Sequence, residues 1–246
     1  MHTAGGQTVR PDGRANDELR PVVITPRYLD HNPASVLVQM GRTWVLCAAS
    51  VAEDVPFWLR NQVRGWVTAE YGLLPAATHT RTPREARQGR LRGRTHEIQR
   101  MIGRSLRAAL DLRKLGERTI TIDCDVIQAD GGTRTAAVTG GYVALALALN
   151  ELVQSGAVHR NVWGAPVAAV SVGIVQGESL LDLSYEEDSR AEVDLNVVMN
   201  ARARFVEVQG TAEGQPFERA RMDELLDLAE KGINELLAVQ KQVLAG

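Results

Sequence analysis

The segment 129–135, Ala-Asp-Gly-Gly-Thr-Arg-Thr, combines two glycines with a hydroxyl and a guanidinium group. Glycines let the backbone turn sharply and bring amide N–H groups close to a ligand. A strand-like run precedes the segment and an apolar helix-like run follows it, so its N–H groups would lie at a helix N-terminus, which favours an anion. The Gly-Lys-Ser/Thr element of a nucleotide-binding loop is missing. From the residues alone, a phosphate pocket containing Thr133 and Arg134 and a plain helix cap beside an exposed arginine are equally acceptable.

Arginines gather in the segment 81–107. It holds nine of them against two carboxylates, a net charge of +7, although the whole chain carries −2. The guanidinium group offers a planar fork of donors that matches phosphate oxygens, so this segment suggests a polyanion such as RNA. A solvated helix face with ion pairs is the alternative. Arg94, at the start of the helix-like run, could converge on the same anion as Arg134.

The segment 178–194 has the opposite character, with seven carboxylates against one arginine, a net charge of −6. Asp188 and Asp194, if brought together, could hold Mg²⁺, and one of them could act as a general acid or base. On composition alone an acidic surface loop is the simpler interpretation. A phosphate pocket, a basic track and paired acids are, however, the parts that phosphoryl transfer requires.

Hydrophobic periodicity predicts the elements that must position these residues. Two β-rich runs, 36–40 and 43–52, flank Gly41 and Arg42 and predict a tight hairpin. Alternation over 119–129 predicts a half-buried strand. Further short strands are expected over 167–175, 180–184, 193–199 and 205–209.

Helices are expected over 95–115, 135–153 and 222–244, the second of them apolar on nearly all sides and therefore buried. Strict alternation of strands and helices is absent. The order of elements therefore favours an α+β fold of sheet and helix layers over a doubly wound one.

Composition excludes several classes of protein. With 246 residues, 44% of them hydrophobic, and only two cysteines, the chain is neither disordered, collagen-like nor disulfide-stapled. We expect one domain over 1–246, with about the first 14 residues flexible. Cys47 and Cys124 should be buried free thiols, and five scattered histidines make a zinc site unfavourable. We see no signal peptide and no membrane span, and so expect a cytoplasmic protein.

Several motifs together resemble bacterial ribonuclease PH, and the resemblance covers nearly the whole chain. The motifs are Arg10-Pro-Asp-Gly-Arg14, Leu19-Arg-Pro21, Gly65-Trp-Val-Thr-Ala-Glu-Tyr71, Arg94-Thr-His-Glu-Ile-Gln-Arg100, the segment 123–135, and Tyr185-Glu-Glu-Asp-Ser-Arg-Ala-Glu-Val-Asp194. No single motif would be specific, but the set is. The resemblance implies a ribonuclease PH-type fold, with two similar βαβ-type halves of the ribosomal-protein domain-2-like superfold.

The resemblance also implies an activity and a site. The family trims the 3′ ends of tRNA precursors and other RNAs with inorganic phosphate as co-substrate, releasing nucleoside diphosphates reversibly. Its phosphate-binding positions match Arg94, Gly132, Thr133 and Arg134. Its acidic catalytic positions match Asp188 and Asp194, which would support Mg²⁺ or Mn²⁺ and protonate the leaving 3′ oxygen. Asp194 is the first candidate for proton donor, although the two roles are exchangeable.

The same resemblance implies a homohexameric ring, a trimer of dimers, with RNA-binding arginines at positions that match Arg81 and Arg84. Ala76 departs from the pattern, because many relatives carry a basic residue there, and this bears on the strength of tRNA binding. Two other functions remain open. One is a non-catalytic RNA-binding subunit of a ring, and the other is a metal-dependent hydrolytic exonuclease.

Overall fold

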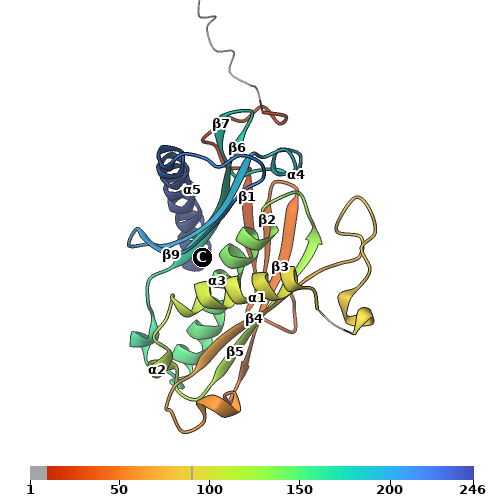
Figure 1. Ribbon diagram of the computed structural model, residues 1–246. Helices are drawn as coiled ribbons and strands as arrows, with labels where there is room; N and C mark the ends of the chain where they lie inside the picture. Colours follow the sequence, from red (N-terminus) through yellow and green to blue (C-terminus); the bar gives the residue numbers. More distant parts are fainter. Residues whose placement is uncertain (1–9, 90) are drawn as a thin grey trace, which may run out of the picture.

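A mixed five-stranded sheet forms the first half of the molecule in the computed structural model, which describes residues 10–89 and 91–246 (Figure 1). Its strand order is β1-β2-β3-β5-β4. Strands β4 and β5 are parallel, and the other neighbours are antiparallel. The strands are β1 (Val22–Pro26), β2 (Ser35–Met40), β3 (Thr43–Ala52), β4 (Trp66–Leu73) and β5 (Thr119–Gln128).

A four-stranded antiparallel sheet of order β7-β6-β8-β9 forms the second half. Its strands are β6 (Val167–Val175), β7 (Glu178–Leu181), β8 (Val193–Asn200) and β9 (Arg204–Ala212). The C-terminal helix α5 (Arg219–Ala245) packs against β6 and β7. Two sheets with packed helices confirm the predicted α+β class and the ribonuclease PH-type fold.

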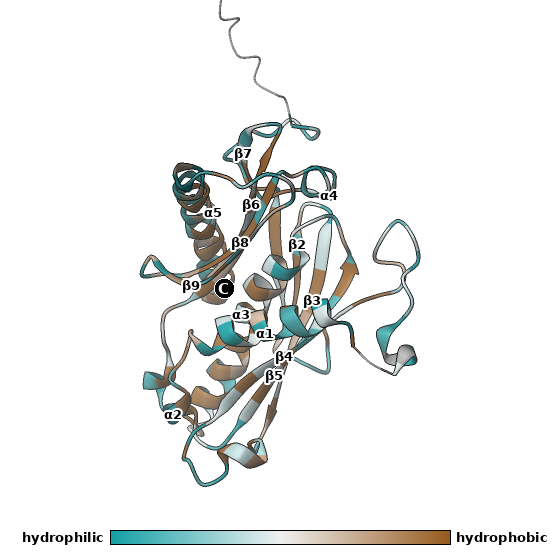
Figure 2. Cartoon of the chain, in the orientation of Figure 1, coloured by the Kyte–Doolittle hydropathy of each residue, from teal (hydrophilic) through white to brown (hydrophobic). Residues whose placement is uncertain are grey.

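Helix α3 (Thr133–Gln154) is the centre of the core. It contacts β2 and β3 of the first sheet and β6 of the second, and every residue from Thr135 to Leu149 is buried. By length and composition α3 could cross a membrane, but 78% of its most apolar window is buried inside the protein. Figure 2 shows hydrophobic residues through α3 and the neighbouring strands, with hydrophilic residues in the surrounding loops. The all-round apolar pattern therefore reflects a helix enclosed by two sheets.

Helix α1 (Gly93–Arg107) packs against β4 and α3, and its outer face carries arginines. The sequence predicted one helix over 95–115, but the chain breaks after α1 and resumes as the single turn α2 (Leu112–Leu115). The side chain of Asp111 accepts a hydrogen bond from the Arg113 N–H, and Leu110 forms a β-bridge with Trp163. Both contacts favour a new helix start over continuation of α1.

Other predicted elements agree with the structure. The hairpin forms between β2 and β3, and Gly41 has the positive φ of +55° that its tight turn needs. The predicted strands correspond to β5, β6, β7, β8 and β9. Cys47 and Cys124 are free and buried, as predicted, and face each other across β3 and β5. Strands β1 and β4, and the short helix α4 (Tyr185–Asp188), were not predicted.

The N-terminal segment was expected to be flexible through about residue 14. Residues 1–9 lie outside the described part of the chain. Residues 10–20, in contrast, form no regular structure but run beside the second sheet, and Arg10 is only 3% exposed. Side-chain contacts rather than backbone periodicity hold this segment in place.

Candidate active site

One cavity of about 580 Å³ lies between the two halves of the molecule. This volume falls in the range of ordinary small-molecule sites, roughly 300–1,000 Å³. The residues that line it come from α1, the start of α3, α4, β4, β6 and β8, and from the loops between them. They include every residue predicted for phosphate binding and catalysis: Arg94, Gly132, Thr133, Arg134, Asp188 and Asp194.

The turn before α3 closes one side of the cavity. Gly131 and Gly132 have φ values of +75° and +64°, which L side chains rarely adopt. A Cβ on Gly131 would lie 2.5 Å from the Leu183 carbonyl oxygen, so only glycine allows this close approach to α4. The Thr43 hydroxyl donates to the Gly131 carbonyl (2.6 Å) and accepts from the Asp130 N–H (2.9 Å). These contacts hold the turn from the side of β3.

The N-terminus of α3 opens into the same cavity. Its N-cap residue, Gly132, has no side chain to accept from the first-turn N–H groups, which leaves them available for an anion. The Thr133 hydroxyl shares a 2.7 Å hydrogen bond with the Tyr71 hydroxyl. Burial raises the pKa of Tyr71. Tyr71 was not among the predicted site residues, although it ends one of the recognised motifs.

Two guanidinium groups supply positive charge. Arg94 is exposed in the first turn of α1, whereas Arg134 is held by two acceptors, the Glu97 carboxylate (3.3 Å) and the Gln209 side-chain oxygen (3.2 Å). Glu97 follows Arg94 by three residues, a spacing that places both on one face of α1. The sequence therefore contained a signal for Glu97. Gln209 comes from β9, and no sequence spacing connects it with Arg134.

The carboxylates stand on the opposite side. Asp188 ends α4, and Asp194 is the second residue of β8. Burial and the negative charge of Asp194 raise the pKa of Asp188, although Arg94 and Arg134 act in the opposite direction. The negative charge of Asp194 and the positive charges of Arg94 and Arg134 thus act on Asp188 from opposite directions. An isolated surface loop would show neither effect.

Two further polar residues line the cavity beside Asp194. Asn196 lies on the same face of β8, because side chains two residues apart in a strand point the same way. Ser171 lies opposite Asn196 on the neighbouring strand β6. Strand periodicity could have identified Asn196 from the position of Asp194, but Ser171 depends on the pairing of β6 with β8.

Composition favoured an acidic surface loop over 178–194, but the structure has the short helix α4 within this segment. Ser184 and Glu187 form a capping box, in which Glu187 accepts from the Ser184 N–H at 2.8 Å. The spacing of Ser184 and Glu187 is the sequence signature of this cap. Burial tends to raise the pKa of Glu187, but the hydrogen bonds from Arg10 and Ser184 outweigh it and leave this pKa below its usual value.

The two arginines predicted for RNA binding lie near the cavity but outside its lining. Arg84 lines a second cavity of about 430 Å³, which shares Tyr71, Leu73 and Arg94 with the first. Arg81 is exposed in the loop between Thr80, which lines the first cavity, and Thr82, which lines the second. Arg90, another member of the basic segment, lies outside the described residues.

Comparison with protein families places both halves of the chain in one family. Residues 18–149 match domain 1 of the 3′ exoribonuclease family, and residues 165–232 match domain 2 of that family. The boundary between the two matches falls between α3 and β6. The first match supplies Arg94 and the α3 N-terminus, and the second supplies both aspartates.

Solved structures share the fold. Rice (Oryza sativa) Rrp46 is 17% identical, with a TM-score of 0.78 over 96% of this chain and 100% of that chain. An Archaeoglobus fulgidus exosome with RNA bound to the active site is 24% identical, with a TM-score of 0.77 over 94% of this chain and 92% of that chain. An archaeal exosome core is 23% identical, with a TM-score of 0.74 over 94% of this chain and 91% of that chain. At these identities the likeness concerns the fold alone.

Proposed function

The chain belongs to the 3′ exoribonuclease family, and we propose that it is an active, phosphate-dependent member that removes nucleotides from RNA 3′ ends. One observation carries this proposal. Arg94, the open N-terminus of α3 and the two aspartates line a single cavity, although they lie far apart in the sequence. Phosphorolysis needs an anion site and an acid site next to each other, and this cavity provides both.

Inorganic phosphate would occupy the cationic side. Arg94 and Arg134 offer guanidinium donors, the Thr133 hydroxyl adds another, and the first N–H groups of α3 complete the site. These groups stabilise negative charge where it develops during transfer. A water molecule used for hydrolysis would gain nothing from so many anion contacts.

The chemistry follows from this placement. A phosphate oxygen attacks the phosphorus of the last phosphodiester in line, and the bond from that phosphorus to the preceding nucleotide's 3′ oxygen breaks. The terminal nucleotide leaves as a nucleoside diphosphate. A carboxylic acid, from Asp188 or Asp194, delivers a proton to the departing 3′ oxygen. The shortened RNA then ends in a 3′ hydroxyl, and the step is reversible.

A divalent cation fits the acidic side. No group of three or more His, Cys, Asp or Glu side chains suited to a metal occurs among residues 10–89 and 91–246. Asp188 would be the first candidate for ligand while Asp194 donates the proton, or the two would exchange these roles, with the remaining positions left to water and substrate oxygens, as Mg²⁺ commonly accepts. The ion would supply charge neutralisation at the transferred phosphoryl group. Mn²⁺ would suit the same oxygen ligands.

The RNA would reach the cavity along the basic segment. Arg84 and Arg92 line the second cavity, which joins the first at Arg94, and Arg81 lies in the loop between them. We propose tRNA precursors with extra 3′ nucleotides as substrates, and a homohexameric ring as the assembly. The solved archaeal neighbours are exosomes, one with RNA at its active site, which supports a ring and an RNA ligand.

A non-catalytic ring subunit is the second candidate, and the likeness to Rrp46 and to exosome cores favours it as much as an active enzyme. The two candidates differ in the site. A subunit without activity has no need for two aspartates facing two arginines across one cavity. Their presence here is the reason for preferring the enzyme.

The test uses purified protein and a tRNA that carries extra 3′ nucleotides, with and without inorganic phosphate. We expect trimming only with phosphate, and nucleoside diphosphates as the product. Monophosphates released in phosphate-free buffer would identify a hydrolytic nuclease. RNA binding without release of nucleotides in either buffer would identify a non-catalytic subunit.

A further inference from the structure

The segment of residues 10–20, called here the N-terminal strap, runs beside the second sheet at Leu181 and Asp182 and carries three arginines. These arginines, Arg10, Arg14 and Arg20, contact two buried carboxylates, Asp182 and Glu187. None of the five residues lines the main cavity. The first family match begins at residue 18, so Arg10 and Arg14 precede the matched segment, although both belong to the first of the motifs quoted in the sequence analysis.

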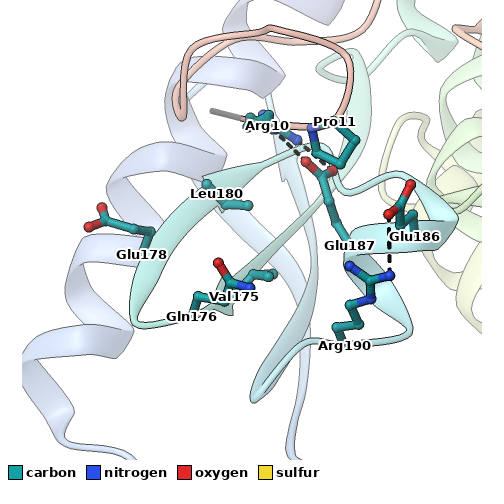
Figure 3. Close-up of a pocket in the computed structure, with 9 residues that line it drawn as sticks. All are labelled: Arg10, Pro11, Val175, Gln176, Glu178, Leu180, Glu186, Glu187 and Arg190. Carbon is teal, nitrogen blue, oxygen red and sulfur yellow. Dashed lines mark hydrogen bonds and ion pairs between the residues drawn. The ribbon is translucent and has the colours of Figure 1, made fainter. Parts of the chain in front are cut away.

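The first ion pair supports the acidic side. Arg10 forms a two-pronged contact with Glu187, from Nε to Oε1 (2.7 Å) and from Nη2 to Oε2 (2.8 Å), and Arg10 Nη1 also donates to the Leu181 carbonyl (2.9 Å). The Arg10 and Glu187 side chains are only 1% and 3% exposed. Glu187 also accepts a hydrogen bond from the Ser184 N–H at the start of α4, and the catalytic candidate Asp188 follows it directly in the chain. Figure 3 shows the contact between Arg10 and Glu187 as dashed lines.

The second ion pair supports the phosphate-binding turn. The Arg20 backbone N–H and Nε both donate to Asp182 Oδ2 at 2.9 Å, and Nη2 donates to Oδ1 at 2.7 Å. Its remaining nitrogen, Nη1, donates to the Asp130 carbonyl at 2.5 Å. Arg20 therefore joins the second sheet to the turn that precedes Gly131 and Gly132. Asp182 adopts a φ of +54°, an unfavourable value for aspartate that these bonds help to maintain.

Local structure cannot hold either element by itself. Helix α4 has four residues, far fewer than the roughly 12–15 at which an isolated helix becomes even marginally stable in water. The turn depends on two residues of positive φ. Two-pronged pairs between buried Arg and carboxylate groups fix geometry as well as charge, because each guanidinium fork fits one orientation.

We propose that the N-terminal strap is a positioning element of the active site, in which Arg10 places Asp188 through Glu187, and Arg20, held by Asp182, places the phosphate-binding turn through the Asp130 carbonyl. This proposal rests on the proposed phosphorolytic function. It divides the strap into two parts with different kinetic effects. Loss of the Arg10 pair affects turnover, and loss of the Arg20 pair affects use of phosphate.

The kinetic test compares three full-length variants with the wild type. Because a displacement of about 1 Å can reduce catalysis about 100-fold, we expect Arg10→Met to lower kcat roughly 10- to 100-fold with a phosphate KM within about threefold. We expect Arg20→Met to raise the phosphate KM about tenfold or more. Arg190→Gln is the matched control, since it removes the exposed pair between Glu186 of α4 and Arg190 just after it, whose side chains are 54% and 64% exposed (Figure 3). It should leave both constants unchanged.

Thermal unfolding and circular dichroism show whether each variant folds. If a methionine variant does not fold, Arg10→Lys and Arg20→Lys replace it, because lysine keeps the charge but loses the fork. The same separation of kcat and KM is expected for them, with smaller changes. Wild-type constants in a folded Arg10 or Arg20 variant, or an equal loss in Arg190→Gln, would overturn the proposal.

Hydrogen exchange separates this proposal from the proposed function. Amides of residues 183–191 should exchange faster in the Arg10 variant than in the wild type or in Arg190→Gln. If the wild type released no nucleotides, the phosphorolytic function would fail while this measurement still reported on the strap. Unchanged exchange in the folded Arg10 variant would refute positioning, even with an active wild type.

Discussion

The two walls of the cavity are built differently. The cationic wall, formed by Arg94, Thr133 and Arg134, belongs to the first turns of α1 and α3, helices of 15 and 22 residues. The acidic wall, formed by Asp188 and Asp194, belongs to the single turn α4 and to the start of β8. Long helices are positioned by their apolar faces, which bury many residues at once. A single turn buries little, so it depends on ion pairs with the N-terminal strap.

This difference shows where evolutionary change should be tolerated. The helices of the cationic wall keep their backbone when one side-chain contact is lost, because packing around α3 remains, whereas the turn before α3 also relies on Arg20 of the strap. The acidic wall can lose its geometry through a change at Arg10, a residue outside the cavity. Four experiments test the contrast, beginning with the acidic wall itself.

Replacing Asp194 by asparagine should have the largest effect. The amide keeps the size of the side chain but cannot donate a carboxylic proton or supply negative charge, so turnover should fall by about 10²- to 10⁴-fold. RNA affinity, measured by fluorescence anisotropy, should stay close to that of the wild type. Asp223→Asn, on the exposed surface of α5, is the control. Near-normal turnover of Asp194→Asn would remove this residue from the mechanism.

Replacing Arg94 by alanine should come next. Loss of one preorganised contact to the transferred phosphate should lower the rate on the order of 100-fold or more. The effect should appear in the dependence of rate on phosphate concentration. Arg113→Ala, an exposed arginine of α2, is the matched control. Unchanged dependence of the rate on phosphate concentration in Arg94→Ala would contradict a phosphate-binding role for Arg94.

Replacing Gly131 by alanine tests the contact between the walls. The new Cβ would lie 2.5 Å from the Leu183 carbonyl oxygen, and φ is +75°, so the free energy of unfolding should fall by about 1–3 kcal/mol or more. Gly156→Ala has a similar φ of +74° but open space around the new Cβ, and it isolates the backbone effect. Denaturant unfolding measures both. Equal losses would mean that the two walls are not in tight contact.

Replacing Gln209 by leucine should have the smallest effect. Arg134 would lose one of its two acceptors and keep Glu97, so the phosphate KM should rise only about three- to tenfold, as expected for a typical net hydrogen-bond contribution of about 1 kcal/mol. Gln209→Glu retains an acceptor but adds a negative charge beside the anion site, so it should not restore the affinity for phosphate. A change in kcat without a change in KM would contradict this role for Gln209.

Sequence patterns predicted the regular elements well where periodicity was strong. The buried helix α3, the alternating strand β5 and the β2–β3 hairpin all follow from apolar spacing and turn residues. Strand β4 lies on a sheet edge and was missed as an element, although its side chains alternate, with Val67, Ala69 and Tyr71 buried and Glu70 exposed. Helix α4 was missed because four residues show no helical period. The capping box of Ser184 and Glu187 was the one sequence signal that could have identified it.

The residue types alone determined which chemical groups the chain contains. These are guanidinium groups, a glycine turn before an apolar helix, and a surplus of carboxylates between Glu178 and Asp194. Tertiary structure decided which of these groups meet. Seven carboxylates occupy that segment, yet Asp188 and Asp194 line the cavity, while Asp182 and Glu187 are buried against arginines of the strap. Charge can be counted along a sequence, but burial and partners depend on how distant segments pack, because a carboxylate's role is set by the groups around it.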